Sequence, residues 1–398
     1  MAHDDTETLA LYVHWPWCLS KCPYCDFNSH QLDAAGPDQG IYQSAILRDL
    51  NHFAEKTKGR LLTSIFFGGG TPSLVDPDTI HTVIEAAENH WGLARDVEIT
   101  LEANPTSAES AKFRAFRNAG INRVSIGVQA LIDEDLQALG REHTSGEAVR
   151  ALDIAAAVFN RYTFDLIYAR PGQGVGAWAD ELEQALELAA PENGGHVSLY
   201  QLTVEPGTAF FRQNIAEANE DLAADLYQLT QDLCGEAGMP AYEVSNHARP
   251  GCESRHNTAY WTGRDYIGIG PGAHGRVTAG GVTTATHQIA DPARWLDAIH
   301  KTGHGTAKVR ELSRQERIEE LVLTGLRLTA GLARSRFRAL SGSDVMDVVN
   351  LQALAELQST GLAVLDDATL RVTDQGRPML NTIIQRLLDE PDTAERAI

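Results

Sequence analysis

The sequence predicts an α/β fold built around a parallel β-sheet. Short runs rich in Val, Ile and Phe alternate with longer amphipathic stretches through the first half of the chain, and polar residues follow each run. Strands that alternate with helices favour a parallel sheet with the helices packed outside it. Six such units fit either an incomplete barrel or a doubly wound sheet, and periodicity does not separate the two. In both architectures the functional residues lie at the carboxyl ends of the strands.

The individual elements follow from these runs. The six expected strands are residues 11–15, 64–67, 98–101, 123–128, 162–167 and 197–202. Helical patterns lie between them at residues 108–118, 146–159 and 176–188, and Gly120 ends the first of these helices.

The character of the chain changes after about Lys308. Residues 317–327 and 345–357 have helical periodicity, residues 360–373 form two short strands around an acidic turn, and a last helix runs to Leu388. This order predicts a smaller α+β domain of the winged-helix type. Residues 310–398 contain 11 basic and 14 acidic residues, so we do not expect a nucleic-acid surface there.

Composition narrows the class of protein further. The chain has 398 residues, of which 43% are hydrophobic and 22% charged, as in ordinary globular proteins. Its formal charge of -21 disfavours broad contact with phosphate backbones. The acidic N-terminus lacks the apolar core of a signal peptide, and no apolar run approaches the roughly 20 residues of a membrane span. We therefore expect a cytoplasmic protein that does not span a membrane.

Three of the five cysteines, Cys18, Cys22 and Cys25, fall within eight residues. Thiolates packed into one short loop suit zinc or an iron–sulfur cluster, and three ligands leave one metal position open. Cys234 and Cys252 lie far from this loop, and we expect them to be incidental thiols. This usage is typical of a cytosolic protein with metal-ligating cysteines rather than disulfides.

Polar residues gather where the expected strands end. The first strand leads into the cysteine loop, and the second ends in the run Gly68-Gly69-Gly70-Thr71-Pro72. The later strand ends contribute Glu102, Asn104, Gln129, Asp165, Gln201 and Thr203. Because the carboxyl ends of parallel strands meet at one edge of a sheet, these residues predict a shared pocket.

The cysteine loop resembles the cluster loop of radical S-adenosylmethionine (SAM) enzymes, with Tyr12 six residues ahead of it and Tyr24 inside it. The resemblance implies an incomplete parallel (β/α)6 barrel in which the three cysteines hold a [4Fe–4S] cluster. The fourth iron of that cluster binds the amino and carboxylate groups of SAM. A zinc loop completed by His14, His30 or Asp26, in a binding module without redox chemistry, is the alternative.

The same resemblance implies a set of SAM-binding residues. They are Tyr12, Tyr24, Gly69, Gly70, Thr71, Glu102, Gln129, Arg141, Asp165, Thr203 and His274. Glycine is needed where backbone approaches a ligand closely. Glu102 would accept from a ribose hydroxyl or an amine, and the planar guanidinium of Arg141 is suited to a carboxylate.

Within this family, residues 11 to about 388 resemble the oxygen-independent coproporphyrinogen III oxidases and the HemW-type heme chaperones. The oxidases carry a further cysteine two residues after the third, where this chain has Phe27, and they have a longer arm before the cluster than the 17 residues found here. Both differences favour the chaperone branch. The implied partners are heme and an acceptor hemoprotein, which can be membrane-associated. Oxidation of coproporphyrinogen III is the alternative activity.

The segment Arg255-His256-Asn257-Thr258-Ala259-Tyr260-Trp261 is typical of the chaperone branch and has been associated there with heme. His256 is a candidate axial ligand, since imidazole binds heme iron well, and the alternative is a hydrogen-bonded structural histidine. The basic residues of segment 334–338 could hold porphyrin propionates or a partner protein, or form a solvated helix face. We divide the chain into a partial barrel (1–245), a linking or lid segment (246–308) and a C-terminal domain (309–398).

Overall fold

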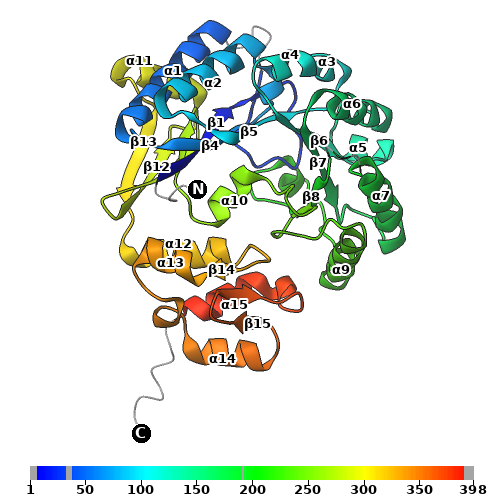
Figure 1. Cartoon of the computed structure of the whole chain (residues 1–398). Helices are drawn as coiled ribbons and strands as arrows, with labels where there is room; N and C mark the ends of the chain where they lie inside the picture. The colour runs from blue at the N-terminus through cyan, green and yellow to red at the C-terminus, as the bar shows by residue number, and fades with distance from the viewer. Residues whose placement is uncertain (1–6, 33–37, 191, 193, 390–398) are drawn as a thin grey trace.

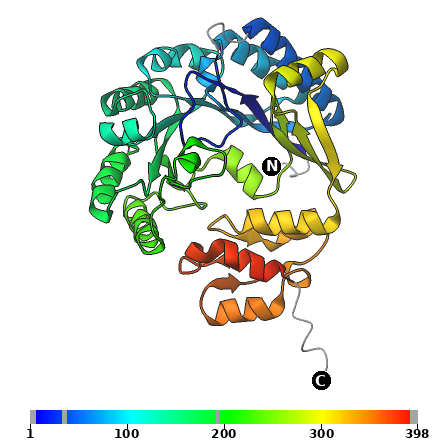
Figure 2. The ribbon, with the colours of Figure 1, turned by 180° about the vertical axis from the view of Figure 1, so that it is seen from behind.

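The computed structural model describes residues 7–32, 38–190, 192 and 194–389. Six parallel strands stand side by side in chain order, and Figures 1 and 2 show helices covering their convex outer face. The strands are β1 (Thr8–Trp15), β4 (Leu61–Gly69), β5 (Leu93–Ala103), β6 (Arg123–Gln129), β7 (Arg161–Tyr168) and β8 (His196–Gln201). The helices are α1 (Gln39–Lys56), α2 (Pro77–Trp91), α3 (Ser107–Ser110), α4 (Phe113–Asn118), α5 (Asp133–Ala138), α6 (Ser145–Val158) and α7 (Val175–Leu188). The sheet curves without closing, so the predicted incomplete barrel is confirmed.

The apolar runs become central strands because both faces of the sheet are covered. Seven of the eight residues of β1 are buried, and β6 and β7 are nearly as inaccessible. All six predicted strands form. The predicted helix 108–118 is wrong in one respect, since it breaks into α3 and α4. The side chain of Glu109 turns inward to accept from the backbone N–H of Asn104 (2.8 Å), and the chain is redirected before α4 begins.

Residues 246–308 extend the same sheet at both ends. Strand β9 (Asn246–Ala248) pairs antiparallel with β8, and β10 (Tyr266–Ile269) pairs parallel with the opposite side of β1. Strands β11 (His274–Ala279), β12 (Val282–Gln288) and β13 (Thr306–Glu311) continue the sheet beyond β10 with antiparallel pairing, and α11 (Pro292–Thr302) lies between β12 and β13. The described residues thus form an eleven-stranded sheet, in which the N-terminal strand is internal.

The remaining elements complete this part of the molecule. They are β2 (Trp17–Cys18), β3 (His30–Gln31), a 3-10 turn η2 (Pro72–Leu74), α8 (Ala209–Arg212), α9 (Glu220–Glu236) and α10 (Arg255–Trp261). Helix α10 lies inside the curve of the sheet, whereas the other helices of the barrel lie outside it (Figure 1). Among the described residues, no helix is both long and apolar enough to cross a bilayer.

The C-terminal domain has its own apolar core, which includes Phe337, Leu354, Leu370 and Ile383. Its elements are α12 (Arg314–Gly325), β14 (Leu332–Ala333), α13 (Arg334–Ser341), η3 (Val345–Asp347), α14 (Leu351–Ser359), β15 (Ala363–Leu365), β16 (Thr369–Val372), η4 (Arg377–Met379) and α15 (Leu380–Leu388). The predicted hairpin is present, and β14 adds a third strand beside β16. The predicted helix 345–357 is wrong at its start, because Asn350 caps α14 by accepting from the N–H of Ala353 (3.0 Å).

The α10 helix joins the barrel to the C-terminal domain. The guanidinium of Arg327 lies 4.8 Å from the ring centre of Trp261, and Arg317 donates to the carbonyl of Gly263 (2.8 Å). Arg336 donates to the carbonyl of Thr262.

The arginines of α13 make ion pairs and hydrogen bonds within the protein, although the side chain of Arg338 is 61% exposed. Arg334 and Arg338 both donate to the carboxylate of Asp344, and Arg336 is held by α10 as described. Each guanidinium already has a partner within the molecule. The interpretation of this cluster as a propionate site has no support in the contacts, because these arginines hold the domain and its contact with α10 together.

Candidate functional site

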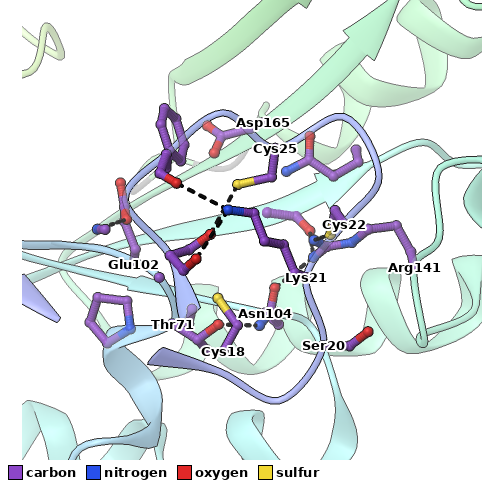
Figure 3. Close-up of a pocket in the computed structure, with 18 of the residues that line it drawn as sticks. Cys18, Ser20, Lys21, Cys22, Cys25, Thr71, Glu102, Asn104, Arg141 and Asp165 are labelled. Carbon is purple, nitrogen blue, oxygen red and sulfur yellow. Dashed lines mark hydrogen bonds between the residues drawn. The ribbon is translucent and has the colours of Figure 1, made fainter. Parts of the chain in front are cut away.

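A polar cavity opens at the carboxyl ends of the parallel strands, where the sequence places the site (Figure 3). Loops after β1, β4 and α5 and strand ends of β5 to β7 contribute to its wall. The structure brings together there the predicted residues Cys18, Cys22, Tyr24, Cys25, Gly69, Gly70, Thr71, Glu102, Gln129, Arg141 and Asp165. We call it the cysteine cavity.

The three cysteines lie at different points of one loop, and all three line the cysteine cavity (Figure 3). Cys22 accepts a hydrogen bond from the guanidinium of Arg141 (N···S 3.2 Å), and the sulfur of Cys25 lies 3.4 Å from the hydroxyl of Ser29. Burial raises the pKa of Cys18 to about 11, so its thiol is protonated at neutral pH. Among the described residues, no three His, Cys, Asp or Glu side chains are grouped closely enough for a single metal ion.

The cysteine loop is held in place at its far end by Asn28. The side-chain amide of Asn28 donates to the carbonyls of Pro271 (3.0 Å) and Ala290 (2.9 Å). Its backbone carbonyl contacts Nε2 of His14 (2.9 Å). The cysteines therefore lie on a loop whose position is set by the residues that follow β10 and β12. Such preorganisation is expected of a loop that binds a rigid inorganic group.

The glycine run is required by packing against the cysteine loop. Gly70 donates its N–H to the carbonyl of Trp15 (2.6 Å), and Thr71 donates to the carbonyl of Trp17 (2.9 Å). A Cβ atom on Gly70 would lie 2.7 Å from that same Trp17 oxygen. Gly69 has a φ of +117°, and a Cβ atom there would meet the ring of His14 at 2.5 Å. The two loops are thus fastened together by backbone, which larger residues would force apart.

Two carboxylates face each other inside the cavity. Glu102 accepts from the N–H of Gly69 (3.0 Å), and its pKa is raised to about 8, first by burial and then by the charge of Asp165. Burial also raises the pKa of Asp165 to about 6, against the opposing effect of a hydrogen bond from Ser198. Carboxylates with raised pKa values are stabilised in their ionised form by a cationic ligand group. A cationic group of a ligand placed beside these two carboxyls would stabilise their ionised form, although Lys21 and Arg141 also line the cavity.

Gln129 and Arg141 also line the cysteine cavity. Gln129 has a φ of +73° at an irregularity in the pairing of β6 with β7, which turns its side chain toward the cavity. Arg141 donates to the carbonyls of Asn104 (2.6 Å, side chain) and Gly127 (2.8 Å, backbone) in addition to Cys22. Arg141 thus links the cysteine loop to the ends of β5 and β6.

Asn104, which was expected here from its place at a strand end, and Gly127, which was not predicted, both line the cavity. Asn104 also donates to the hydroxyl of Thr71 (3.3 Å) and to Glu109 (3.2 Å). A Cβ atom on Gly127 would lie 2.9 Å from the amide nitrogen of Gln129. In the sequence, Asn104 is marked by its place directly after a strand end, and Gly127 is marked as a lone glycine within a predicted strand.

Two predicted residues line a second cavity that shares Gly69 and Glu102 with the cysteine cavity. They are Tyr12 and His274. Thr203 lines neither cavity. It is exposed, and its hydroxyl contacts the carbonyl of Gln201 (3.5 Å).

His256 is not placed as an iron ligand. It is 2% exposed, its Nδ1 pairs with the hydroxyl of Ser64 (2.9 Å), and its Nε2 pairs with the hydroxyl of Tyr260 (2.7 Å). Both ring nitrogens are therefore occupied inside the barrel. Burial, with a smaller effect of the charge on Arg123, lowers the pKa of His256 to about 3, so the ring is neutral. This geometry favours the structural alternative, and ligation of heme iron by His256 stays a prediction.

Comparisons with known proteins identify the family of the chain. The Radical SAM superfamily model matches residues 12–189, and the HemN C-terminal domain model matches residues 312–379. The chain is 38% identical over 392 residues to radical S-adenosyl methionine domain-containing protein 1 of Mus musculus, covering 96% of this chain and 87% of that protein. It is 36% identical over 384 residues to heme chaperone HemW of Escherichia coli, covering 96% and 98%.

A solved structure supports the fold independently. Coproporphyrinogen III oxidase (HemN) of Escherichia coli superposes with a TM-score of 0.81 at 22% identity, over 97% of this chain and 91% of that one. An identity this low establishes the fold alone, whereas the nearly full-length relatives establish the family. The chain belongs to the radical SAM superfamily and, within it, to the family that includes heme chaperone HemW and radical SAM domain-containing protein 1.

Proposed function

We propose that this protein is a heme chaperone that binds a [4Fe–4S] cluster, SAM and heme and transfers the heme to an acceptor hemoprotein. The observation that carries the proposal is the similarity over nearly the full length to proteins named heme chaperone HemW. Phe27, at the position where the related oxidases have a further cysteine, supports the same branch. We propose that the protein acts in the cytoplasm and that the acceptor is associated with a membrane.

The residues of the cysteine cavity fit the two cofactors. Cys18, Cys22 and Cys25 would hold the cluster, because their thiols line one cavity that also has room for a ligand beside them. Glu102 and Asp165 supply negative charge that suits the cationic groups of SAM. Gly69, Gly70, Thr71, Tyr24, Gln129 and Arg141 would complete its binding site.

When bound, the cluster and SAM supply one-electron chemistry that the side chains of the protein lack. The chain itself orients the ligands. Arg141 holds the cysteine loop beside Asn104, and the hydrogen bond from Gly69 fixes the carboxylate of Glu102. Because Gly69 and Glu102 line both cavities, an occupant of the second cavity would lie next to the proposed SAM site.

SAM affinity should rise as the pH increases from about 6 to about 8, because Asp165 and Glu102 lose their protons over that range. The unliganded protein should show the opposite trend in stability. A carboxyl whose pKa is higher in the folded than in the unfolded protein adds stability at low pH. This stability is lost as the pH rises through the folded-state pKa. Equilibrium binding of SAM to the cluster-loaded protein at several pH values tests this. Glu102→Gln should flatten the profile, and an unchanged slope would contradict the assignment.

Oxygen-independent oxidation of coproporphyrinogen III is the second candidate, favoured by the structural similarity to HemN. An anaerobic assay with reductant, SAM and coproporphyrinogen III separates the two. We expect the cluster-loaded protein to bind hemin and to form no protoporphyrinogen, while an oxidase in a parallel reaction does. Robust product formation would replace the chaperone assignment with the oxidase.

A further inference from the structure

The second cavity lies beside the cysteine cavity and is lined largely by aromatic side chains. Its volume is about 410 Å³, and its rings are those of Tyr12, Phe27, Tyr260 and Tyr266, with His14 and His274. The rings of Tyr260 and Tyr266 pack edge to face with their centres 4.4 Å apart. A wall of this kind suits a flat, apolar ligand better than a sugar or a phosphate.

Phe27 is presented at the rim of both cavities. It is 64% exposed, although its neighbours are held firmly: Ser29 donates its N–H to the carbonyl of Phe27 (2.7 Å), and Asn28 is fastened to Pro271 and Ala290. An apolar ring exposed on a rigid turn loses little conformational freedom when a planar ligand packs against it. Phe27 is therefore prepared for contact with such a ligand.

His274 is the histidine of the second cavity whose ring is available. It is exposed, and among the described residues no hydrogen bond engages its ring nitrogens. Its ring stacks against His287 on the neighbouring strand, with the centres 3.9 Å apart. By contrast, His14 in the same cavity is bound through both nitrogens, to Tyr12 (2.9 Å) and to the carbonyl of Asn28 (2.9 Å).

We propose that heme docks at the second cavity, with its macrocycle packed on Phe27 and its iron bound by His274. This proposal rests on the proposed chaperone function and replaces His256 with His274 as the iron ligand. It also moves His274 from the SAM site to the heme site. A porphyrin exceeds the cavity in size, so part of the macrocycle stays outside, where an acceptor protein can reach it.

Anaerobic titration of the cluster-loaded protein with hemin tests the proposal, with the Soret band and the electron paramagnetic resonance spectrum as readouts. His274→Ala should remove the histidine-ligand signature and weaken binding about tenfold or more. Phe27→Ala should weaken binding about two- to tenfold without changing the ligand signature, and Phe27→Tyr should restore the affinity. Leu19→Ala removes a 54% exposed apolar side chain of the same loop and should change neither quantity.

His256→Ala is the decisive comparison, and its melting temperature is measured alongside its spectra. It should keep the ligand signature of the wild type even where its melting temperature falls. An unchanged spectrum and affinity in His274→Ala would overturn the site, as would loss of the signature in a folded His256→Ala protein. If the wild-type protein binds no hemin at all, the proposed function itself fails, which is a different result from binding that is insensitive to His274 and Phe27.

Discussion

Replacing Cys22 by serine should leave the protein without its iron–sulfur cluster. The loop supplies three thiols to one cavity, and a serine hydroxyl is a poor ligand for iron in such a cluster. The variant also loses the sulfur to which Arg141 donates, so the guanidinium keeps only its contacts with Asn104 and Gly127. Iron and sulfide analysis after anaerobic reconstitution should give about four of each per wild-type chain and almost none in the variant.

Cys252→Ser is the matched control for this experiment. Cys252 is also a half-buried free cysteine, but it lies outside the cysteine cavity, beside Gly195. The control protein should bind the cluster at the wild-type level. Normal iron and sulfide in Cys22→Ser, or their loss in Cys252→Ser, would show that the ligand assignment is mistaken.

Glu98→Ala should produce the largest loss of stability among the substitutions considered, about 3–5 kcal/mol. Glu98 is 3% exposed and receives hydrogen bonds from Arg161 (3.0 Å), the hydroxyl of Ser254 (3.4 Å) and the N–H of His256 (3.3 Å). Its removal leaves a partly buried guanidinium without its carboxylate and loosens the start of α10. The free energy of unfolding by denaturant measures the effect.

Asp96→Ala is the comparison on the same strand. Like Glu98, Asp96 pairs with an arginine. Its partner is Arg255 of α10 (2.6 Å), and this ion pair is largely exposed. Exposed pairs contribute roughly 0–1 kcal/mol, so this variant should stay within that range of the wild type. Equal losses of unfolding free energy in the two variants would mean that burial is not the reason for the large contribution of Glu98 to stability.

Much of the barrel and of its cysteine cavity could be predicted from the sequence, because both depend on strong local patterns. Strands that are buried on two faces appear as continuous apolar runs, and the polar residues that follow them necessarily meet at one edge of the sheet. Strand β10 escaped prediction because its buried run is only four residues long, and β11 to β13 because they lack such apolar runs. In β13 every residue is partly or fully exposed, so no apolar period marks it.

Side-chain roles were harder to predict than positions. The sequence motif around His256 is the same whether its imidazole faces a ligand or two hydroxyl groups. The burial of α10 inside the barrel favours the two hydroxyl groups, and this burial could not be seen in the sequence. Arg141 was expected to meet a carboxylate of the ligand, and this stays a prediction. Its partners within the protein, Cys22 and Asn104, lie 119 and 37 residues away in the chain and were not predicted. Contacts of this range depend on the tertiary fold.

The placement of β1 has a consequence for how the protein is made on the ribosome. This strand emerges first, but its second neighbour in the sheet, β10, begins only at Tyr266. The amide of Asn28 finds its two carbonyl partners later still, at Pro271 and Ala290. A nascent chain shorter than about 290 residues lacks the second of these partners, so we expect the cysteine loop to be fully held in place only after most of the chain has been translated.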